Sequence, residues 1–211
     1  MPDFAGFPEA ALDFYDDLET ENTRSFWTAN KATYDTAVRA PMAALVTALE
    51  PEFGAAKVFR PYRDVRYAKD KTPYKTHQGG FVPARISTGW YVQLDARGVS
   101  VSAGSYAAEP ALLARFREAV ASASGAGQLT LLLNHLEGTG WQVEGDRLRS
   151  SPRGYPRDHP NIELLRHRSL WVTRSYGFAL VIHRPELVER VRADWRETRP
   201  LVEWLLAHAT G

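Results

Sequence analysis

The residues whose types and spacing could do chemistry are concentrated in one short segment. Residues 60–75, here called the signature segment, contain six cations and three tyrosines but only two aspartates. The planar guanidinium of arginine can donate two parallel hydrogen bonds to a carboxylate or a phosphate, and lysine adds a point charge. The pattern therefore predicts an anion site. We expect its ligand-binding groups to be Arg60, Arg63, Arg66, Lys71 and Tyr74.

Internal pairing is a second interpretation of the same segment. Asp64 and Asp70 could each pair with a neighbouring arginine while the tyrosines stack on guanidinium groups. Two aspartates can neutralise at most two of the six cations, so the sequence leaves both interpretations open. Because Asp64 is flanked by Arg63 and Arg66, we expect it to be ionised, which makes it a poor general acid but a plausible catalytic base, orienting group or metal ligand.

A second basic segment, residues 147–168, holds six arginines against one aspartate and one glutamate. Gly154 follows Arg153 in a proline-punctuated stretch, and glycine lets backbone amides approach a ligand. We expect Arg153 to bind the same anion as the signature segment, across one shared cleft. His159 would handle a proton if there is catalysis. The alternative is a solvated connection between a hairpin and the sheet.

Several common catalytic signatures are missing from the sequence. There is no G-x-S-x-G elbow, no H-E-x-x-H motif, no G-x-x-x-x-G-K-[S/T] loop and no G-x-G-x-x-G before a helix. The absence of cysteine excludes disulfides, thiolate metal sites and a cysteine nucleophile. The six histidines show no ligand spacing. We therefore expect no metal site, and the sequence identifies no cofactor.

Length, composition and charge predict one domain, residues 1–211. Hydrophobic residues make up 44% of the chain, which is enough to build a single core. The net charge of +1 argues against non-specific electrostatic binding of nucleic acid by the whole chain. No apolar run approaches the length of a membrane span, and the start of the chain lacks a secretory signal. We expect a cytoplasmic protein with no membrane contact, and leave its oligomeric state open.

Apolar periodicity and turn residues predict an α+β fold, in which N-terminal and C-terminal helices cover a mainly antiparallel sheet. Helices are expected at 8–18, from Asn22 or Thr23, from Pro41 to about 54, from Pro110, at 128–137, and from Pro185 with a kink or split at Pro200. Strands are expected at 57–60, 89–95, 98–104, 169–176 and 178–182, with a second small hairpin at 141–148. The signature segment itself is predicted as strand, irregular turn and strand, and 121–127 as a flexible connection.

The signature segment resembles the motif R-x-x-R-D-x-R-F-x-x-x-[D/N]-K-x-x-Y of a bacterial family of conserved hypothetical proteins, domain of unknown function 2461. Tyr67 departs from the motif, because it stands where the family has Phe and adds a hydroxyl that needs a partner. Similarity continues over most of the chain, including Phe26-Trp27 and 151–155. The resemblance implies membership of the family and no particular activity. The matching positions are Arg60, Arg63, Asp64, Arg66, Asp70, Lys71 and Tyr74.

Three functions are open at this point. The leading hypothesis is binding of a small anionic metabolite that bears phosphate or carboxylate, with turnover if Asp64 or His159 moves a proton. The second is single-stranded nucleic-acid binding, in which Tyr62, Tyr67 and Tyr74 stack bases while cations track phosphates. The third is a non-catalytic interaction domain whose arginines dock an acidic protein partner. The sequence does not decide whether the protein is an enzyme.

Overall fold

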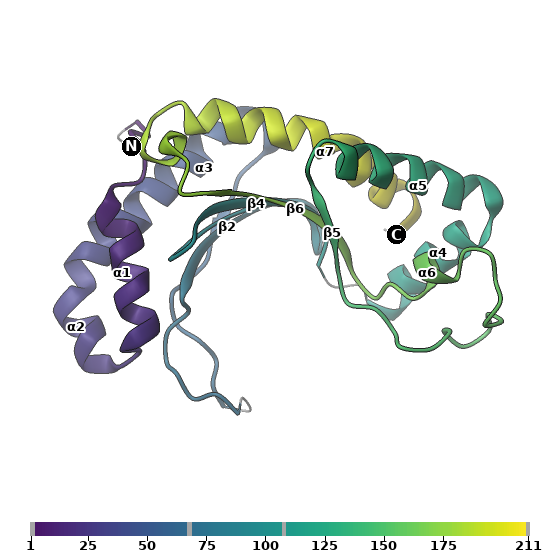
Figure 1. The fold of residues 1–211 in the computed structure, drawn as a ribbon, viewed down its shortest axis with the longest axis horizontal. Helices are drawn as coiled ribbons and strands as arrows, with labels where there is room; N and C mark the ends of the chain where they lie inside the picture. The colour runs from purple at the N-terminus through teal and green to yellow at the C-terminus, as the bar shows by residue number, and fades with distance from the viewer. Residues whose placement is uncertain (1–2, 67–68, 107–108, 210–211) are drawn as a thin grey trace. The chain divides into compact units, whose positions relative to one another are not determined.

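The computed structural model describes residues 3–66, 69–106 and 109–209, and it confirms the predicted α+β fold (Figure 1). The helices are α1 (Glu9–Thr20), α2 (Arg24–Thr33), α3 (Ala40–Phe53), α4 (Pro110–Ala121), α5 (Ala123–Gly138), α6 (Ile162–Leu165) and α7 (Leu187–Ala209). The strands are β1 (Lys57–Val58), β2 (His77–Arg85), β3 (Thr88–Asp95), β4 (Gly98–Ser105), β5 (Gln142–Glu144) and β6 (Leu170–Gly177). No helix among these described residues is long and apolar enough to cross a membrane.

The strands form one sheet in the order β1-β2-β3-β4-β6-β5. The predicted hairpin of β3 and β4 is confirmed, and Gly98 serves its turn with a φ of +107°. A Cβ atom at Gly98 would lie 1.8 Å from the carbonyl oxygen of Gly177, so only glycine fits there. The second small hairpin was predicted wrongly. Strand β5 pairs instead with β6, antiparallel, with Val143 opposite Val172, because the longer strand β6 offers it a full edge.

Contacts along the chain divide it into two units. The first comprises residues 1–82, 91–101 and 175–193. The second comprises residues 83–90, 102–174 and 194–211. The signature segment belongs to the first unit, whereas Arg153 and His159 belong to the second.

In the first unit, the two helices predicted after Asn22 are present as α2 and α3, but they belong to one continuous helical run. The Thr23 hydroxyl caps α2 by accepting a hydrogen bond from the Phe26 amide at 3.1 Å, as its position predicted. The run then continues through a π-helical segment, Tyr34–Arg39, into α3 without a break at Pro41. It ends at Gly54, whose φ is +96°.

In the second unit, the predicted flexible connection at 121–127 is wrong, because α5 already begins at Ala123. The Ser122 hydroxyl accepts a hydrogen bond from the Gly125 amide at 3.1 Å, and this cap initiates the helix despite its small residues. The predicted strand at 178–182 is also wrong. Residues Leu180–His183 form a 3-10 turn after β6, whose last residue, Gly177, has a φ of +55°. Helix α7 is not split at Pro200.

A buried charge network joins elements of the second unit. Arg174 of β6 pairs with Asp194 of α7, and its guanidinium lies 3.0 Å from the Glu197 carboxylate. It also donates to the Thr139 carbonyl oxygen at 2.6 Å and lies 4.5 Å from the ring centroid of Trp141. Since the Arg174 side chain is only 12% exposed, this network holds a charge that burial would otherwise penalise.

Candidate functional site

The signature segment forms an irregular hairpin between β1 and β2. The irregular turn was predicted, but the two strands predicted beside it are reduced, among the described residues, to one isolated bridge between Tyr62 and Tyr74. The Arg63 amide donates to the Pro73 carbonyl oxygen at 2.9 Å, which ties the two arms together. In Figure 1 this hairpin is the long loop that extends below β2. Tyr67, which we considered as a base-stacking residue, lies outside the described residues.

Asp64 and Arg66 pair with each other on the hairpin. Nε of Arg66 lies 2.9 Å from Oδ1 of Asp64, and Nη2 lies 2.7 Å from Oδ2. Hydrogen bonds from the Arg66 side chain and backbone lower the pKa of Asp64, so its carboxyl group is ionised at neutral pH, as expected. The Arg66 side chain remains 77% exposed, so the pair is a surface contact rather than a buried one.

Two other cations of the hairpin bind its own groups. Arg63 pairs with Asp70, and the Lys71 amine donates to the Val65 carbonyl oxygen at 2.9 Å. The backbone amide of Thr72 and then Arg63 lower the pKa of Asp70 to about 2. The two aspartates therefore pair with two arginines, as the internal-pairing interpretation predicted.

Tyr74 packs inside the first unit and docks the hairpin on α2. Its ring, 6% exposed, stacks on Trp27 with centroids 4.2 Å apart and planes 8° apart, rather than on an arginine. The Asn22 side chain donates to the Tyr74 carbonyl oxygen at 2.9 Å and accepts from its amide at 3.1 Å. Tyr74 therefore fixes the position of Trp27 and of the hairpin base.

A cleft of about 290 Å³ lies at the base of the hairpin, and we call it the aromatic cleft. Trp27, Tyr34 and Tyr62 supply aromatic walls. Two arginines, Arg39 and Arg60, are exposed at this cleft, and no ion pair or hydrogen bond from another described residue engages either guanidinium. The full lining is Trp27, Lys31, Tyr34, Asp35, Arg39, Val58, Phe59, Arg60, Pro61 and Tyr62.

The π-helical segment brings three of these residues to the aromatic cleft: Tyr34, Asp35 and Arg39. π-Helical turns are rare and occur frequently at functional sites. Pro41 gives a physical reason for this one, because proline lacks an N–H group and its ring clashes with the carbonyl group four residues earlier. That carbonyl belongs to Ala37, inside the widened segment.

The floor of the aromatic cleft is held by a buried hydrogen bond. The Tyr34 hydroxyl donates to Oε1 of Gln78 at 2.6 Å, and Nε2 of Gln78 donates to the Phe59 carbonyl oxygen at 2.8 Å. Burial raises the pKa of Tyr34 to about 12, so the hydroxyl keeps its proton at neutral pH. This link joins the π-helical segment to the stretch after β1 that carries Phe59 and Arg60.

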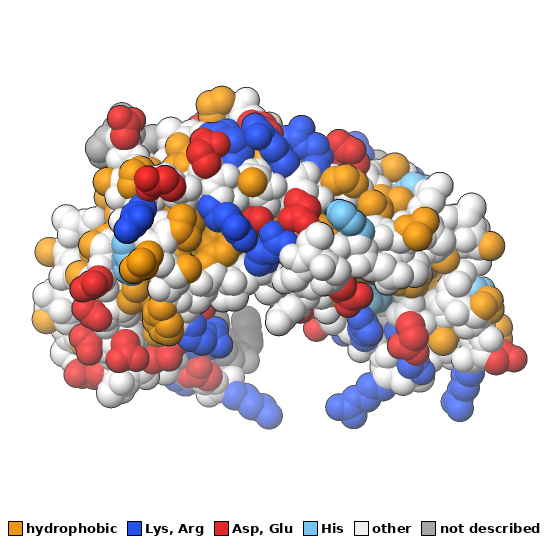
Figure 2. Space-filling model, turned by 45° about the horizontal axis from the view of Figure 1, so that its top comes forward, with side chains coloured by type: hydrophobic (Ala, Val, Ile, Leu, Met, Phe, Trp, Pro, Cys, Tyr) orange, Lys and Arg blue, Asp and Glu red, His pale blue; other side chains and the backbone are white. Residues whose placement is uncertain are grey.

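Positive charge gathers near Arg60, because Asp35 in the cleft lining is paired with Lys31. Lys57 and Lys75 place their amines 5.8 Å and 5.3 Å from the ring centroid of Phe59. Partial burial, followed by the neighbouring charges of Arg60 and Lys57, lowers the pKa of Lys75. Acidic side chains gather elsewhere, over the N-terminal helices at the left of Figure 2.

Arg153 and His159 lie on an exposed loop of the second unit. No hydrogen bond or ion pair within the described chain engages the Arg153 guanidinium. Nδ1 of His159 accepts a hydrogen bond from the Asn161 amide at 3.0 Å, which leaves the proton of the neutral ring on Nε2. That this loop and the signature segment share one cleft stays a prediction.

A second cleft, of about 340 Å³, lies in the second unit, and we call it the α5–α6 cleft. It is lined by a histidine that sequence reasoning passed over, His167, which is 2% exposed. The sequence favoured His159 because an aspartate precedes it, whereas nothing in the spacing marks His167. The lining residues are Thr130, Leu133, Asn134, Glu137, Val143, Arg147, Pro160, Asn161, Glu163, Leu164 and His167.

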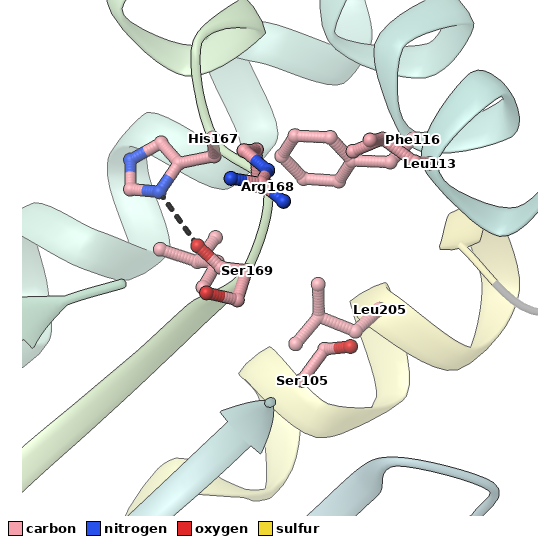
Figure 3. A pocket seen from close by; sticks show the side chains of 8 residues that line it. Ser105, Leu113, Phe116, His167, Arg168, Ser169 and Leu205 are labelled. Atoms are coloured by element: carbon pink, nitrogen blue, oxygen red, sulfur yellow. Dashed lines mark hydrogen bonds between the residues drawn. The ribbon is translucent and has the colours of Figure 1, made fainter. Parts of the chain in front are cut away.

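A much smaller cavity, of about 20 Å³, is lined by His167 and the three residues after it (Figure 3). Phe116, Leu113 and Leu205 make it mostly apolar. Its volume suits roughly one water molecule, so it cannot hold a metabolite. In Figure 3 the His167 ring is turned away from these apolar side chains.

Comparison with known proteins assigns the sequence to a family without adding an activity. A family model described as "Conserved hypothetical protein (DUF2461)" matches residues 10–204. Searches of curated proteins and of solved structures found no match. Among the described residues, no group of three or more histidines and carboxylates could hold a metal ion.

Proposed function

Since the chain belongs to the family of conserved hypothetical proteins described as DUF2461, whose description names no activity, we propose a function from geometry. The aromatic cleft binds a small anionic molecule that bears a phosphate or a carboxylate. One observation carries this proposal: Arg39 and Arg60, from separate segments, line the same cleft, and neither guanidinium is paired within the described residues.

The chemistry of the lining supports an anion of modest size. Two guanidinium groups can hold a phosphate or carboxylate by charge-assisted hydrogen bonds, which are roughly twice as strong as neutral ones. The side chains of Trp27 and Tyr34 are buried, and they would exclude water from one side of the ligand. The cleft volume lies at the lower end of the roughly 300–1,000 Å³ of ligand sites, which favours a metabolite over a dinucleotide.

The cations around Phe59 give a second line of support. Lys57, Arg60 and Lys75 repel one another, as the lowered pKa of Lys75 reflects after its partial burial. An anion bound by Arg60 would offset this repulsion, so binding should raise the pKa of Lys75.

Binding, rather than turnover, is the activity we propose. Both oxygens of the Asp64 carboxylate accept hydrogen bonds from Arg66, and its lowered pKa makes it a weak base. His159 belongs to the other unit, and its Nδ1 is occupied by the Asn161 amide. Neither residue lines the aromatic cleft.

Calorimetric titration with inorganic phosphate, pyrophosphate and citrate tests the proposal. We expect Arg39→Gln and Arg60→Gln each to weaken binding roughly 10- to 100-fold, because each removes a hydrogen bond to a charged group. Arg24→Gln removes the same charge from an exposed position outside the cleft and should leave affinity within about twofold. No binding of any of the three anions, or equal losses in all three variants, would overturn the proposal.

Arg66→Gln distinguishes the cleft from the hairpin. The Arg66 guanidinium is paired with Asp64 and does not line the cleft, so this substitution should have little effect on affinity. A large loss with Arg66→Gln and none with Arg39→Gln would place the anion beside Arg66 instead of in the aromatic cleft.

Single-stranded nucleic acid is the second candidate, favoured by Tyr62. Its ring is 48% exposed and lies next to Arg60 in the same lining, an arrangement that could stack a base beside a phosphate. Such binding would fall by about 0.7 log units per neutralised phosphate for each tenfold rise in salt. Micromolar binding of a labelled oligonucleotide near physiological salt, lost on Tyr62→Ala, would promote this candidate above the metabolite.

A further inference from the structure

The α5–α6 cleft is a second site with its own chemistry. One wall is a single face of α5, where Thr130, Leu133, Asn134 and Glu137 recur at the spacing of helical turns. The facing wall carries Arg147 and His167. None of these residues lines the aromatic cleft.

Arg147 and His167 are held side by side by the backbone. They form an antiparallel bridge, flanked by hydrogen bonds from the Leu148 amide to the Arg166 carbonyl at 2.8 Å and from the Arg168 amide to the Asp146 carbonyl at 2.7 Å. This is the pattern of a non-hydrogen-bonded pair, whose Cα atoms lie about 4.5 Å apart and whose side chains share one face. The two side chains are therefore presented together.

The tautomer of His167 follows from its partner. Nδ1 lies 2.9 Å from the Ser169 carbonyl oxygen, which can only accept, so Nδ1 carries the proton. Burial lowers the pKa of His167, so the ring is neutral at physiological pH and Nε2 has a lone pair. In Figure 3 the second ring nitrogen points away from Ser169, and no described residue forms a hydrogen bond with it.

The charged groups of the cleft have opposite signs. Within the described chain, neither the Arg147 guanidinium nor the Glu137 carboxylate has a hydrogen bond or an ion pair. Glu163 is already held by Arg166 at 2.8 Å. A simple anion would be repelled by Glu137, and a simple cation by Arg147. The lining therefore suits a ligand with both charges.

We propose that the α5–α6 cleft binds a small zwitterion, a free α-amino acid or a molecule with the same ammonium and carboxylate groups. Arg147 pairs with the carboxylate, while Glu137 and Nε2 of His167 accept hydrogen bonds from the ammonium group. Leu133, Val143 and Leu164 supply the apolar surface for a side chain.

NMR titration of the full-length protein with the standard L-amino acids tests this proposal, with propionate and ethylamine as probes that carry one charge each. We expect at least one amino acid to bind below about 10 mM and to shift the ¹⁵N resonance of His167 Nε2. Propionate and ethylamine should each bind at least roughly tenfold more weakly, because each lacks one of the two charged contacts.

Variants at exposed lining residues keep the test independent of folding. Arg147→Gln and Glu137→Gln should each weaken binding roughly tenfold or more. Arg149→Gln, the same change two residues along the segment and outside the lining, should not. The absence of amino-acid binding at about 10 mM, or equal affinities for Arg147→Gln and Arg149→Gln, would overturn the proposal. Arg39→Gln should leave this binding intact. The proposals for the two clefts can therefore be tested independently.

Discussion

Replacing Arg174 by leucine should destabilise the protein strongly, because it removes the cation from a buried network. Arg174 pairs with Asp194 and Glu197 and binds the Thr139 carbonyl, and its side chain is 12% exposed. Removing one partner of a buried ion pair costs about 3–5 kcal/mol, since the remaining charges keep their burial penalty. Leucine keeps part of the apolar contact with Trp141, so the loss reports mainly on charge.

The cost should depend on pH, and the sign can be worked out. Burial alone raises the pKa of Glu197, but hydrogen bonds from Thr139, Trp141 and Arg174 bring it below the ordinary value of 4.5. A carboxyl with a depressed folded pKa stabilises the fold above its unfolded pKa and loses that contribution as pH falls. Without Arg174, the pKa values of Asp194 and Glu197 should rise. Protonation of these carboxylates in acid should therefore reduce the destabilisation of the variant.

Urea unfolding followed by tryptophan fluorescence at neutral pH and near pH 4 measures both effects. The difference in free energy of unfolding between wild type and Arg174→Leu should be about 3–5 kcal/mol at neutral pH and should shrink in acid. Arg66→Leu is the matched control, because the Arg66 and Asp64 side chains are both exposed and such surface pairs contribute about 0–1 kcal/mol. Equal losses for the two variants, or a gap that widens in acid, would refute the reasoning.

Two further predictions concern the first unit. Tyr74→Ala should lower the free energy of unfolding in urea by about 3–5 kcal/mol, because it removes a buried ring stacked on Trp27. The control Tyr62→Ala should lower it much less. Similar losses in the two variants would mean that the stack contributes little. Lys75→Gln should raise the thermal midpoint at neutral pH, since the lowered pKa of Lys75 means that its charge is disfavoured in the fold. That gain should vanish above the ordinary lysine pKa of 10.5, and a destabilised variant would contradict it.

Elements with strong local signals were predicted well from the sequence. The β3–β4 hairpin has β-rich strands and a glycine turn, and Thr23 stands where a helix cap is needed. Pairing of Asp64 and Asp70 with arginines followed from their proximity in the chain. These predictions succeeded because the interacting groups are close in sequence.

Features that depend on distant contacts were missed. Strand β5 pairs with β6, which is distant in the sequence, and the expected local hairpin does not form. Arg39 was not considered, because the π-helical segment that brings it to the aromatic cleft has no established sequence signal. His167 became a candidate only when its pairing with Arg147 and its bond to Ser169 were visible.

The π-helical segment allows the geometry of the aromatic cleft to change without a change in the packing of α2 and α3. A π turn inserts extra backbone into an α-helix while the helix on each side stays regular, so the buried faces of α2 and α3 can each pack as they would in an ordinary helix. Trp27 on one side and Leu45 and Leu49 on the other remain in the core. Shortening this segment by one residue could restore a plain helix and rotate Arg39 away from Arg60. The length of this segment is therefore a parameter through which the cleft of this chain can be altered while the core is retained.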